Sequence, residues 1–126
     1  LSSADYAFVG EEAGDSACLS VAGVGDVDGD GLGDLLMGAF GNSEGGSVAG
    51  TSYLVLGASL GASSSLDLSE ADYTFVGEFS NDFSGTPVVG AGDVDGDGLD
   101  DLMIGAQLND DNGTNAGKAY LLLSPY

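Results

Sequence analysis

Two acidic segments carry the most specific chemistry in this chain. Residues 26–34 read Asp-Val-Asp-Gly-Asp-Gly-Leu-Gly-Asp, and residues 93–101 read Asp-Val-Asp-Gly-Asp-Gly-Leu-Asp-Asp. In each segment aspartate stands at positions 1, 3, 5 and 9, and a glycine at position 6 allows a sharp turn. Carboxylate and carbonyl oxygens at this spacing suit Ca²⁺, which takes six to eight oxygen ligands at roughly 2.3–2.6 Å. Zinc would ask for histidine or cysteine, and the chain has no histidine and one cysteine.

We therefore predict two calcium sites in the chain. The carbonyl of the leucine at position 7 is expected to supply one ligand, and the last aspartate is expected to close the site with both carboxylate oxygens. The alternative is an acidic turn that is merely solvated, because Asp-Gly pairs are common turn formers. Two copies at the same place in a repeat favour calcium. The predicted ligands are Asp26, Asp28, Asp30, Leu32 and Asp34 in the first loop and Asp93, Asp95, Asp97, Leu99 and Asp101 in the second.

The segments that flank each loop are predicted to be strands. A helix–loop–helix calcium site needs a bidentate glutamate at position 12, where this chain has Met37 and Ile104. The entering segments, 21–25 and 88–92, are rich in glycine and β-branched residues. The segments that leave the loops are short apolar runs that stop at glycine. Each loop is therefore expected to join two strands.

The chain consists of an internal repeat with a period of 67 residues. Residues 1–59 align with 68–126 without a gap, and 31 of these 59 pairs are identical. We expect one domain, 1–126, made of repeat A (about 1–67) and repeat B (about 68–126). Short apolar segments between glycine-rich turns indicate an all-β fold without helices. The predicted strands are 6–9, 19–24, 35–39 and 52–56 in repeat A and 73–76, 86–91, 102–106 and 119–123 in repeat B.

Two features of the strand pattern bear on how the sheets pack. The runs Tyr-Leu-Val-Leu (53–56) and Tyr-Leu-Leu-Leu (120–123) do not alternate with polar residues. Strands of this kind are expected to be buried on both faces, as in sheets that stack face to face. Residues 57–70 are rich in serine, glycine and alanine, and we interpret them as a low-complexity connector.

The charge of the chain excludes several classes of partner. It has 21 acidic residues against one basic residue, Lys118, for a formal net charge of −20. A surface of this sign repels nucleic acid and anionic membranes, so neither is expected as a partner. No apolar run is long enough to span a membrane. Cys18 cannot form an internal disulfide and is expected to be a small buried thiol.

The residues around the acidic loops resemble the FG-GAP repeats of integrin α-subunit β-propellers and their bacterial relatives. The resemblance runs through residues 10–15, 20–22, 26–39 and 50–56, and it covers nearly the whole chain twice. The chain departs from the family at the Phe-Gly signature, where Ala17-Cys18 and Ser84-Gly85 stand. It also departs at the proline of Gly-Ala-Pro, which is Phe40 in repeat A and Gln107 in repeat B.

The resemblance implies two four-stranded blades of an integrin-like β-propeller. In that family the calcium loop joins the first and second strands of a blade, and loops on the opposite face recognise ligands. Those loops would be roughly 10–18, 41–50, 77–85 and 108–117 in this chain.

The phasing of the repeats predicts that the last blade lacks its outer strand. The chain starts on an outer, fourth strand and ends on a third strand. We expect the N-terminal strand of one chain to complete the last blade of a neighbour, with a six-bladed homotrimer as the favoured closed ring. The alternative is that the chain is a piece of a longer propeller.

The expected function is that of a calcium-binding, non-enzymatic module for binding or adhesion to a protein or glycan ligand. Because weak calcium sites fill where calcium is plentiful, we expect an extracellular or cell-surface location. Without histidine, and with Cys18 and Lys118 unpartnered, Ser–His and Cys–His catalysis is excluded. Glycoside hydrolysis by a carboxylate pair stays open. The carboxylates that could share a face for it are Asp15, Glu44, Asp82, Asp110 and Asp111.

The alternative function is a carbohydrate-binding lectin built on the same propeller. Sugar sites generally want aromatic platforms beside polar groups, and the chain has no tryptophan. The aromatic residues near turns, which we expect to pack between blades instead, are Phe40, Phe79, Phe83 and Tyr126.

Overall fold

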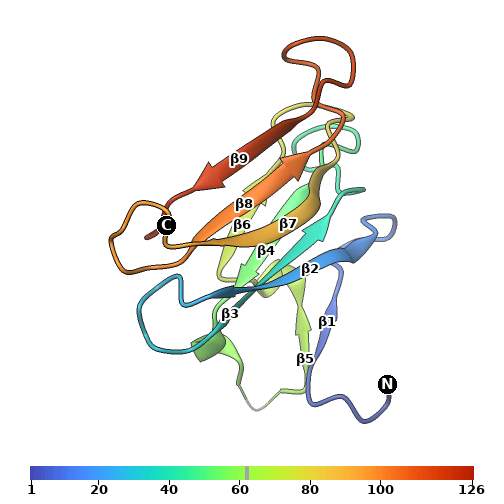
Figure 1. Ribbon diagram of the computed structural model, residues 1–126. Helices are drawn as coiled ribbons and strands as arrows, with labels where there is room; N and C mark the ends of the chain where they lie inside the picture. The colour runs from blue at the N-terminus through green and yellow to red at the C-terminus, as the bar shows by residue number, and fades with distance from the viewer. Residues whose placement is uncertain (62) are drawn as a thin grey trace.

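The computed structural model describes residues 1–61 and 63–126, and it consists of strands joined by loops and short turns (Figure 1). The described part contains two helical turns of three residues each, η1 (Gly57–Ser59) and η2 (Leu68–Glu70), and no longer helix. The all-β prediction is therefore confirmed. The strands are β1 (Ala7–Val9), β2 (Ala17–Gly25), β3 (Asp34–Ala39), β4 (Thr51–Val55), β5 (Ser65–Asp67), β6 (Tyr73–Val76), β7 (Ser84–Gly92), β8 (Asp101–Ala106) and β9 (Lys118–Leu122).

The strands form two antiparallel sheets and one small parallel pair. The first sheet has the order β2-β3-β4-β6, and the second sheet has the order β7-β8-β9. β1 pairs with β5 in parallel and joins neither sheet. All eight strands predicted from the sequence are present, with ends that differ by at most two residues. The first sheet has the expected four strands, whereas the second has three in the part of the chain that is described.

The two sheets stack, and the main core lies between them. β7 packs across β2 and β3, as Figure 1 shows. Glycines allow the close approach, since a Cβ at Gly90 would lie 2.9 Å from the Val24 Cα, and one at Gly38 would overlap the Gly85 carbonyl. This burial of branched side chains from both sheets is what holds the repeats together. The buried core residues are Val24, Val27, Leu36, Leu54, Val88, Leu102 and Ile104.

A second cluster covers the opposite face of the first sheet. Leu68 of η2 is fully buried there against Met37, Tyr53 and Val55, and Leu66 of β5 packs at its margin. The low-complexity connector over 57–70 therefore contains η1, β5 and η2 among the residues described, while residue 62 lies outside them. The reason is physical: leucines spaced through the serine-rich segment bury enough apolar surface to hold it on the sheet.

The two third strands differ in burial, although their sequences are similar. Every residue of β4 is buried, as predicted from its unbroken apolar run. β9 instead alternates between half-buried and exposed residues, and Leu121 is 46% exposed. The prediction of burial on both faces is wrong for β9, because no described residues cover the outer face of the second sheet.

The connections divide between the two ends of the sheets. The β2–β3 and β7–β8 loops lie together at one end, on the left of Figure 1, and the remaining strand connections of the two sheets, apart from the 56–72 connector, lie at the other. This places the two acidic loops side by side. Within the described residues, no helix is long and apolar enough to cross a membrane.

Candidate metal centres

The first acidic loop, named loop I (residues 26–33), is organised by its first carboxylate. Asp26 Oδ1 accepts a hydrogen bond from the Gly29 amide at 2.8 Å, and Oδ2 accepts one from the Gly31 amide at 2.9 Å. Gly31, at position 6, has φ +88°, a left-handed conformation that favours glycine. The predicted tight turn is therefore present, and it wraps backbone amides around the carboxylate at position 1.

The second acidic loop, named loop II (residues 93–100), repeats this arrangement. Asp93 Oδ1 accepts from the amides of Gly96 at 2.7 Å and Asp97 at 3.1 Å, while Oδ2 accepts from the Gly98 amide at 3.0 Å. The identical residues 26–32 and 93–99 thus give nearly identical loop geometry in two places of the chain.

The closing aspartates are buried and tie each loop to the strands around it. Asp34 is 1% exposed; its Oδ2 accepts from the Val27 amide at 2.8 Å, and its Oδ1 accepts from the Gly57 amide at 2.7 Å. Asp101 is fully buried and accepts in the same way from the amides of Val94 at 2.8 Å and Ser124 at 2.9 Å. Each carboxylate links the start of its loop to the segment after the sheet's third strand.

Each loop gathers three carboxylates into one cluster. Asp26, Asp28 and Asp34 each offer an oxygen within 4.8 Å of the others. Oxygens bound to one Ca²⁺ at 2.3–2.6 Å are at most about 5 Å apart, so this spacing fits a single ion. Loop II forms the matching cluster from Asp93, Asp95 and Asp101. The donor set is all oxygen, which suits calcium.

The other predicted ligands are placed differently. Asp30 and Asp97 stand outside the clusters, and their Oδ1 atoms accept from the amides of Leu32 at 2.7 Å and Leu99 at 2.9 Å. Each therefore closes the turn at position 7. Metal ligation by these two aspartates and by the two leucine carbonyls stays a prediction.

A contact between the loops was not foreseen from the sequence. Asp100 Oδ2 accepts a hydrogen bond from the Asp26 amide at 3.0 Å, and the Asp100 amide donates to the Asp26 carbonyl at 3.0 Å. A Cβ at Gly25 would overlap this carboxylate. The corresponding residue of loop I is Gly33, which is the one difference between the two nine-residue segments. That difference was the sequence signal that could have pointed to the contact between the loops.

At the opposite end of the sheets, buried carboxylates are held by asparagines. The Asn42 side-chain amide donates to Asp15 Oδ2 at 3.1 Å, and Asn109 donates to Asp82 Oδ2 at 2.7 Å. Both aspartates are at least 95% buried. These pairs fasten the loops that enter β2 and β7, so two of the five carboxylates considered for glycoside hydrolysis have a structural role.

Lys118 is not unpartnered, which corrects the expectation from the sequence. Its Nζ lies 2.6 Å from Glu78 and 2.8 Å from Asp111, and it stands 4.8 Å from the centre of the Tyr120 ring. The hydrogen bonds that its ammonium donates to Asp111 and Glu78 raise the pKa of Lys118, and the bond from Lys118 lowers the pKa of Glu78. The ammonium thus links the β6–β7 connection, which holds Glu78, to the β8–β9 connection, which holds Asp111.

Repeat A has the same carboxylate without a lysine. Tyr53, buried in β4, donates from its hydroxyl to Glu11 at 2.9 Å, and Thr51 stands where repeat B has Lys118. Burial first, and Glu11 second, raise the pKa of the Tyr53 phenol.

Three of the four aromatic residues near turns pack as expected. Phe40 and Phe83 lie with ring centres 5.5 Å apart, and Tyr126 meets Phe75 edge-on at 5.6 Å. Phe79 does not, since its side chain is 56% exposed beside Asp82 and the carboxylates of the β8–β9 loop. Cys18 is half-buried, and burial raises the pKa of its thiol.

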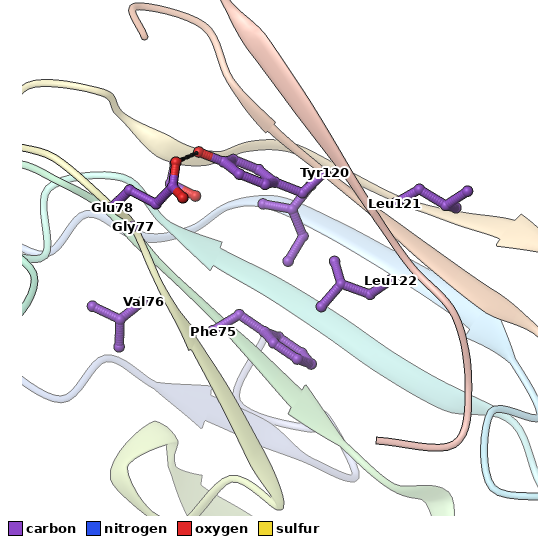
Figure 2. A pocket seen from close by; sticks show the side chains of 9 residues that line it. Phe75, Val76, Gly77, Glu78, Tyr120, Leu121 and Leu122 are labelled. Carbon is purple, nitrogen blue, oxygen red and sulfur yellow. Dashed lines mark hydrogen bonds between the residues drawn. The ribbon is translucent and has the colours of Figure 1, made fainter. Parts of the chain in front are cut away.

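A cavity of about 390 Å³ lies between β6 of the first sheet and β9 of the second (Figure 2). Tyr120 donates from its hydroxyl to Glu78 at 2.8 Å, and Phe75 and Leu122 also line the cavity. The cavity is mainly apolar and borders the outer edge of β9.

Comparison with known families gives a match for the segment that contains loop II. Residues 86–122, which hold most of β7, loop II, β8 and β9, match the model of the family described as FG-GAP repeat. This segment is similar to an FG-GAP repeat. The resemblance drawn from the sequence is thereby confirmed for repeat B. A search of curated proteins gave no match to the chain.

The FG-GAP match covers the cluster of loop II together with the three strands that hold it. Loop I has the two corresponding hydrogen bonds, from Gly29 and Gly31 to Asp26, and the matching carboxylate cluster in the first sheet. Repeat A therefore shares the loop arrangement of repeat B, although the family match does not include repeat A.

Proposed function

We propose that this chain is a calcium-stabilised, non-enzymatic binding module in which the two sheets act as neighbouring blades of an integrin-like propeller. The observation that carries the proposal is the pair of three-carboxylate clusters, one in each loop, with oxygens within 4.8 Å. One of these loops lies inside the FG-GAP match. We assign one Ca²⁺ to each loop.

The physical role of calcium follows from charge. Two unit charges about 4 Å apart repel by about 1 kcal/mol in water and about 4 kcal/mol near a protein surface. Three carboxylates in each loop oppose the fold unless a cation neutralises them, and the chain already carries a net charge of −20. A ligand that binds only the folded state adds about 1.4 kcal/mol of stability for each tenfold excess over its dissociation constant.

The location and the binding face follow from the same sites. Extracellular calcium modules commonly bind at roughly 10⁻⁴–10⁻³ M, which matches calcium levels outside the cell. We therefore propose an extracellular or cell-surface module for adhesion. Its ligand face is formed by the connections at the end of the sheets opposite the metal loops.

A lectin is the second candidate, and Phe79 is the observation that favours it. This ring is 56% exposed and lies beside the carboxylates of Asp110 and Asp111, the combination of an aromatic platform and polar groups that sugars use. A glycan array compared between the natural chain and Phe79→Ala decides between the candidates. A sugar that binds the natural chain and not the variant would establish the lectin.

The calcium role is tested by thermal unfolding in millimolar calcium and in excess chelator. We expect a melting temperature lower by ten degrees or more in chelator, with magnesium restoring little of it. Asp34→Asn and Asp101→Asn should each remove part of the calcium-dependent shift. An unchanged melting temperature would refute the structural role.

A further inference from the structure

The outer edge of β9 is an unpaired strand edge within the described residues. In the first sheet, β4 is flanked by β3 and β6, while β9, its counterpart 67 residues later, pairs with β8 alone. An open edge presents a row of unpaired backbone N–H and C=O groups that favours the addition of a strand.

The pairing of β6 with β4 gives the register that such an added strand would take. Phe75 stands opposite Ser52, and Thr74 stands opposite Tyr53. The Gly77 amide donates to the Gly50 carbonyl at 2.7 Å. Hydrogen-bonded pairs recur at every second position of an antiparallel ladder. Phe75 and Ser52 lie two positions from Gly77 and Gly50, so their backbone groups also point at each other.

β1 carries the sequence needed to repeat this pairing on β9. Residues 6–11 and 73–78 differ only at Ala7, where the second segment has Thr74. The Ala7 amide donates to the Ser64 carbonyl beside β5 at 2.9 Å. Backbone groups alternate in direction along a strand, so the N–H and C=O of the next residue, Phe8, point away from β5. Its counterpart Phe75 directs the same groups toward β4. β1 can accept a new strand without leaving β5.

The outer face of the second sheet is apolar at the matching positions. Val89, Met103 and Leu121 are 46%, 38% and 46% exposed. Their counterparts in the first sheet are Ala22, Leu36 and Leu54, and both leucines are fully buried between the sheets. The second sheet thus exposes side chains at positions whose equivalents in the first sheet are buried between the two sheets.

The complementary face is on the far side of the first sheet. Val21 is 61% exposed there and lines an apolar cavity of about 320 Å³ with Phe8 and Cys18. Its counterpart in the second sheet, Val88, is 5% exposed because it packs against the first sheet. One molecule therefore carries both halves of an interface already formed once within the chain.

We propose that the second sheet binds a second copy of this chain, whose β1 adds to β9 as a fourth strand while its first sheet covers Val89, Met103 and Leu121. The inference rests on the proposed propeller arrangement and names its partner. In the register set by β4 and β6, Phe8 stands opposite Ala119, Val9 opposite Lys118 and Ala7 opposite Tyr120. Three copies joined in this way supply six sheets, the homotrimer expected from the sequence.

In this arrangement, Ala7 and Val9 of the incoming strand face the cavity of Figure 2, because side chains alternate along a strand and Phe8 faces the other way. Val9 is 49% exposed in its own chain, so it is free to fill that space.

The single cysteine provides a direct test of the register. A Cβ at Gly85 would lie 3.1 Å from Ser52 Oγ, across the existing interface between the sheets. The counterparts of these two residues are Cys18 and Ala119. In the proposed complex, Cys18 of one copy therefore lies against Ala119 of the other, within reach of a disulfide after Ala119→Cys. Within one chain, Cys18 lies on the face of the first sheet turned away from the second.

The experiment oxidises Ala119→Cys with diamide in millimolar calcium and enough salt to screen the negative charge. We expect disulfide-linked dimers and trimers that reductant dissolves, at least tenfold more than with Thr114→Cys, an exposed control in the β8–β9 loop. Adding Cys18→Ser should abolish the product. Phe8→Asp, added to Ala119→Cys, should reduce it at least fivefold.

Equal crosslinking of the two cysteine variants, or product that survives Cys18→Ser, would overturn the proposed interface. The melting temperature of the same samples with and without chelator separates the two claims. A calcium-dependent melt without crosslinking removes this interface alone, and crosslinking without a calcium effect removes the calcium role alone.

Discussion

The two sheets are built from similar repeats but differ in what covers them. β4 is buried at all five residues because β3 and β6 flank it, the second sheet packs on one face, and Leu60, Leu66 and Leu68 pack on the other. β9 shares Tyr-Leu-x-Leu with β4, yet it alternates in exposure. The sequence of a strand sets which side chains can be buried, and its neighbours set which of them are.

The largest expected effect contrasts Leu36→Ala with Met103→Ala, the same position in the two sheets. Leu36 is fully buried, so its truncation should cost about 2–5 kcal/mol. Met103 is 38% exposed and should cost about 1 kcal/mol or less in dilute solution. Urea unfolding in calcium measures both. Equal costs at low protein concentration would contradict the difference in cover.

Protein concentration provides a second test of the contrast between Leu36→Ala and Met103→Ala. If a second copy covers the outer face of the second sheet, the cost of Met103→Ala should rise with protein concentration, while that of Leu36→Ala should not. A cost for Met103→Ala that stays constant through the range in which the chain associates would place Met103 outside the interface.

A smaller effect is expected where the loops differ, at Asp100 and Gly33. Asp100→Ala removes the hydrogen bond from the Asp26 amide and should cost about 1 kcal/mol. Gly33→Ala is the matched control, because a Cβ there meets nothing within 4 Å. Chemical denaturation of both variants tests the contact, and a larger loss for Gly33→Ala would contradict it.

The smallest expected effect is that of Lys118→Thr, which gives repeat B the residue of repeat A. Both partners are exposed to solvent, so the loss at neutral pH should be slight. Lys118 lowers the pKa of Glu78 from its usual 4.5, so this pair stabilises the fold above that pH. The stabilisation is lost as the pH falls through the lowered pKa of Glu78.

The stability difference between the natural chain and Lys118→Thr should therefore be present at neutral pH and vanish well below pH 4.5. Unfolding of both proteins across this range measures it. A difference that grows as the pH falls would show that the lysine acts in another way.

Local features of the fold were predictable from the sequence. Glycine and aspartate at fixed spacing determine the loop turns within nine residues, so the clusters around Asp26 and Asp93 follow from short-range chemistry. The strands follow in the same way, since apolar runs between glycines leave few other conformations.

Contacts between distant residues were not predictable. The burial of Leu68, the ion pairs of Lys118 and the contact between Asp100 and Asp26 each join segments separated by a loop, a sheet or a whole repeat. A serine-rich stretch and a single lysine give no local sign of their partners, and the Gly-to-Asp difference marks loop II as distinct without identifying Asp26 as the partner. Such contacts depend on how the sheets stack, which pattern alone does not specify.

The central claim is that each loop holds one calcium ion, and equilibrium dialysis with radioactive calcium tests it most directly. The account predicts about two ions per chain at millimolar calcium, one in Asp34→Asn and one in Asp101→Asn. Binding of no calcium, or a stoichiometry unchanged by either substitution, would contradict it.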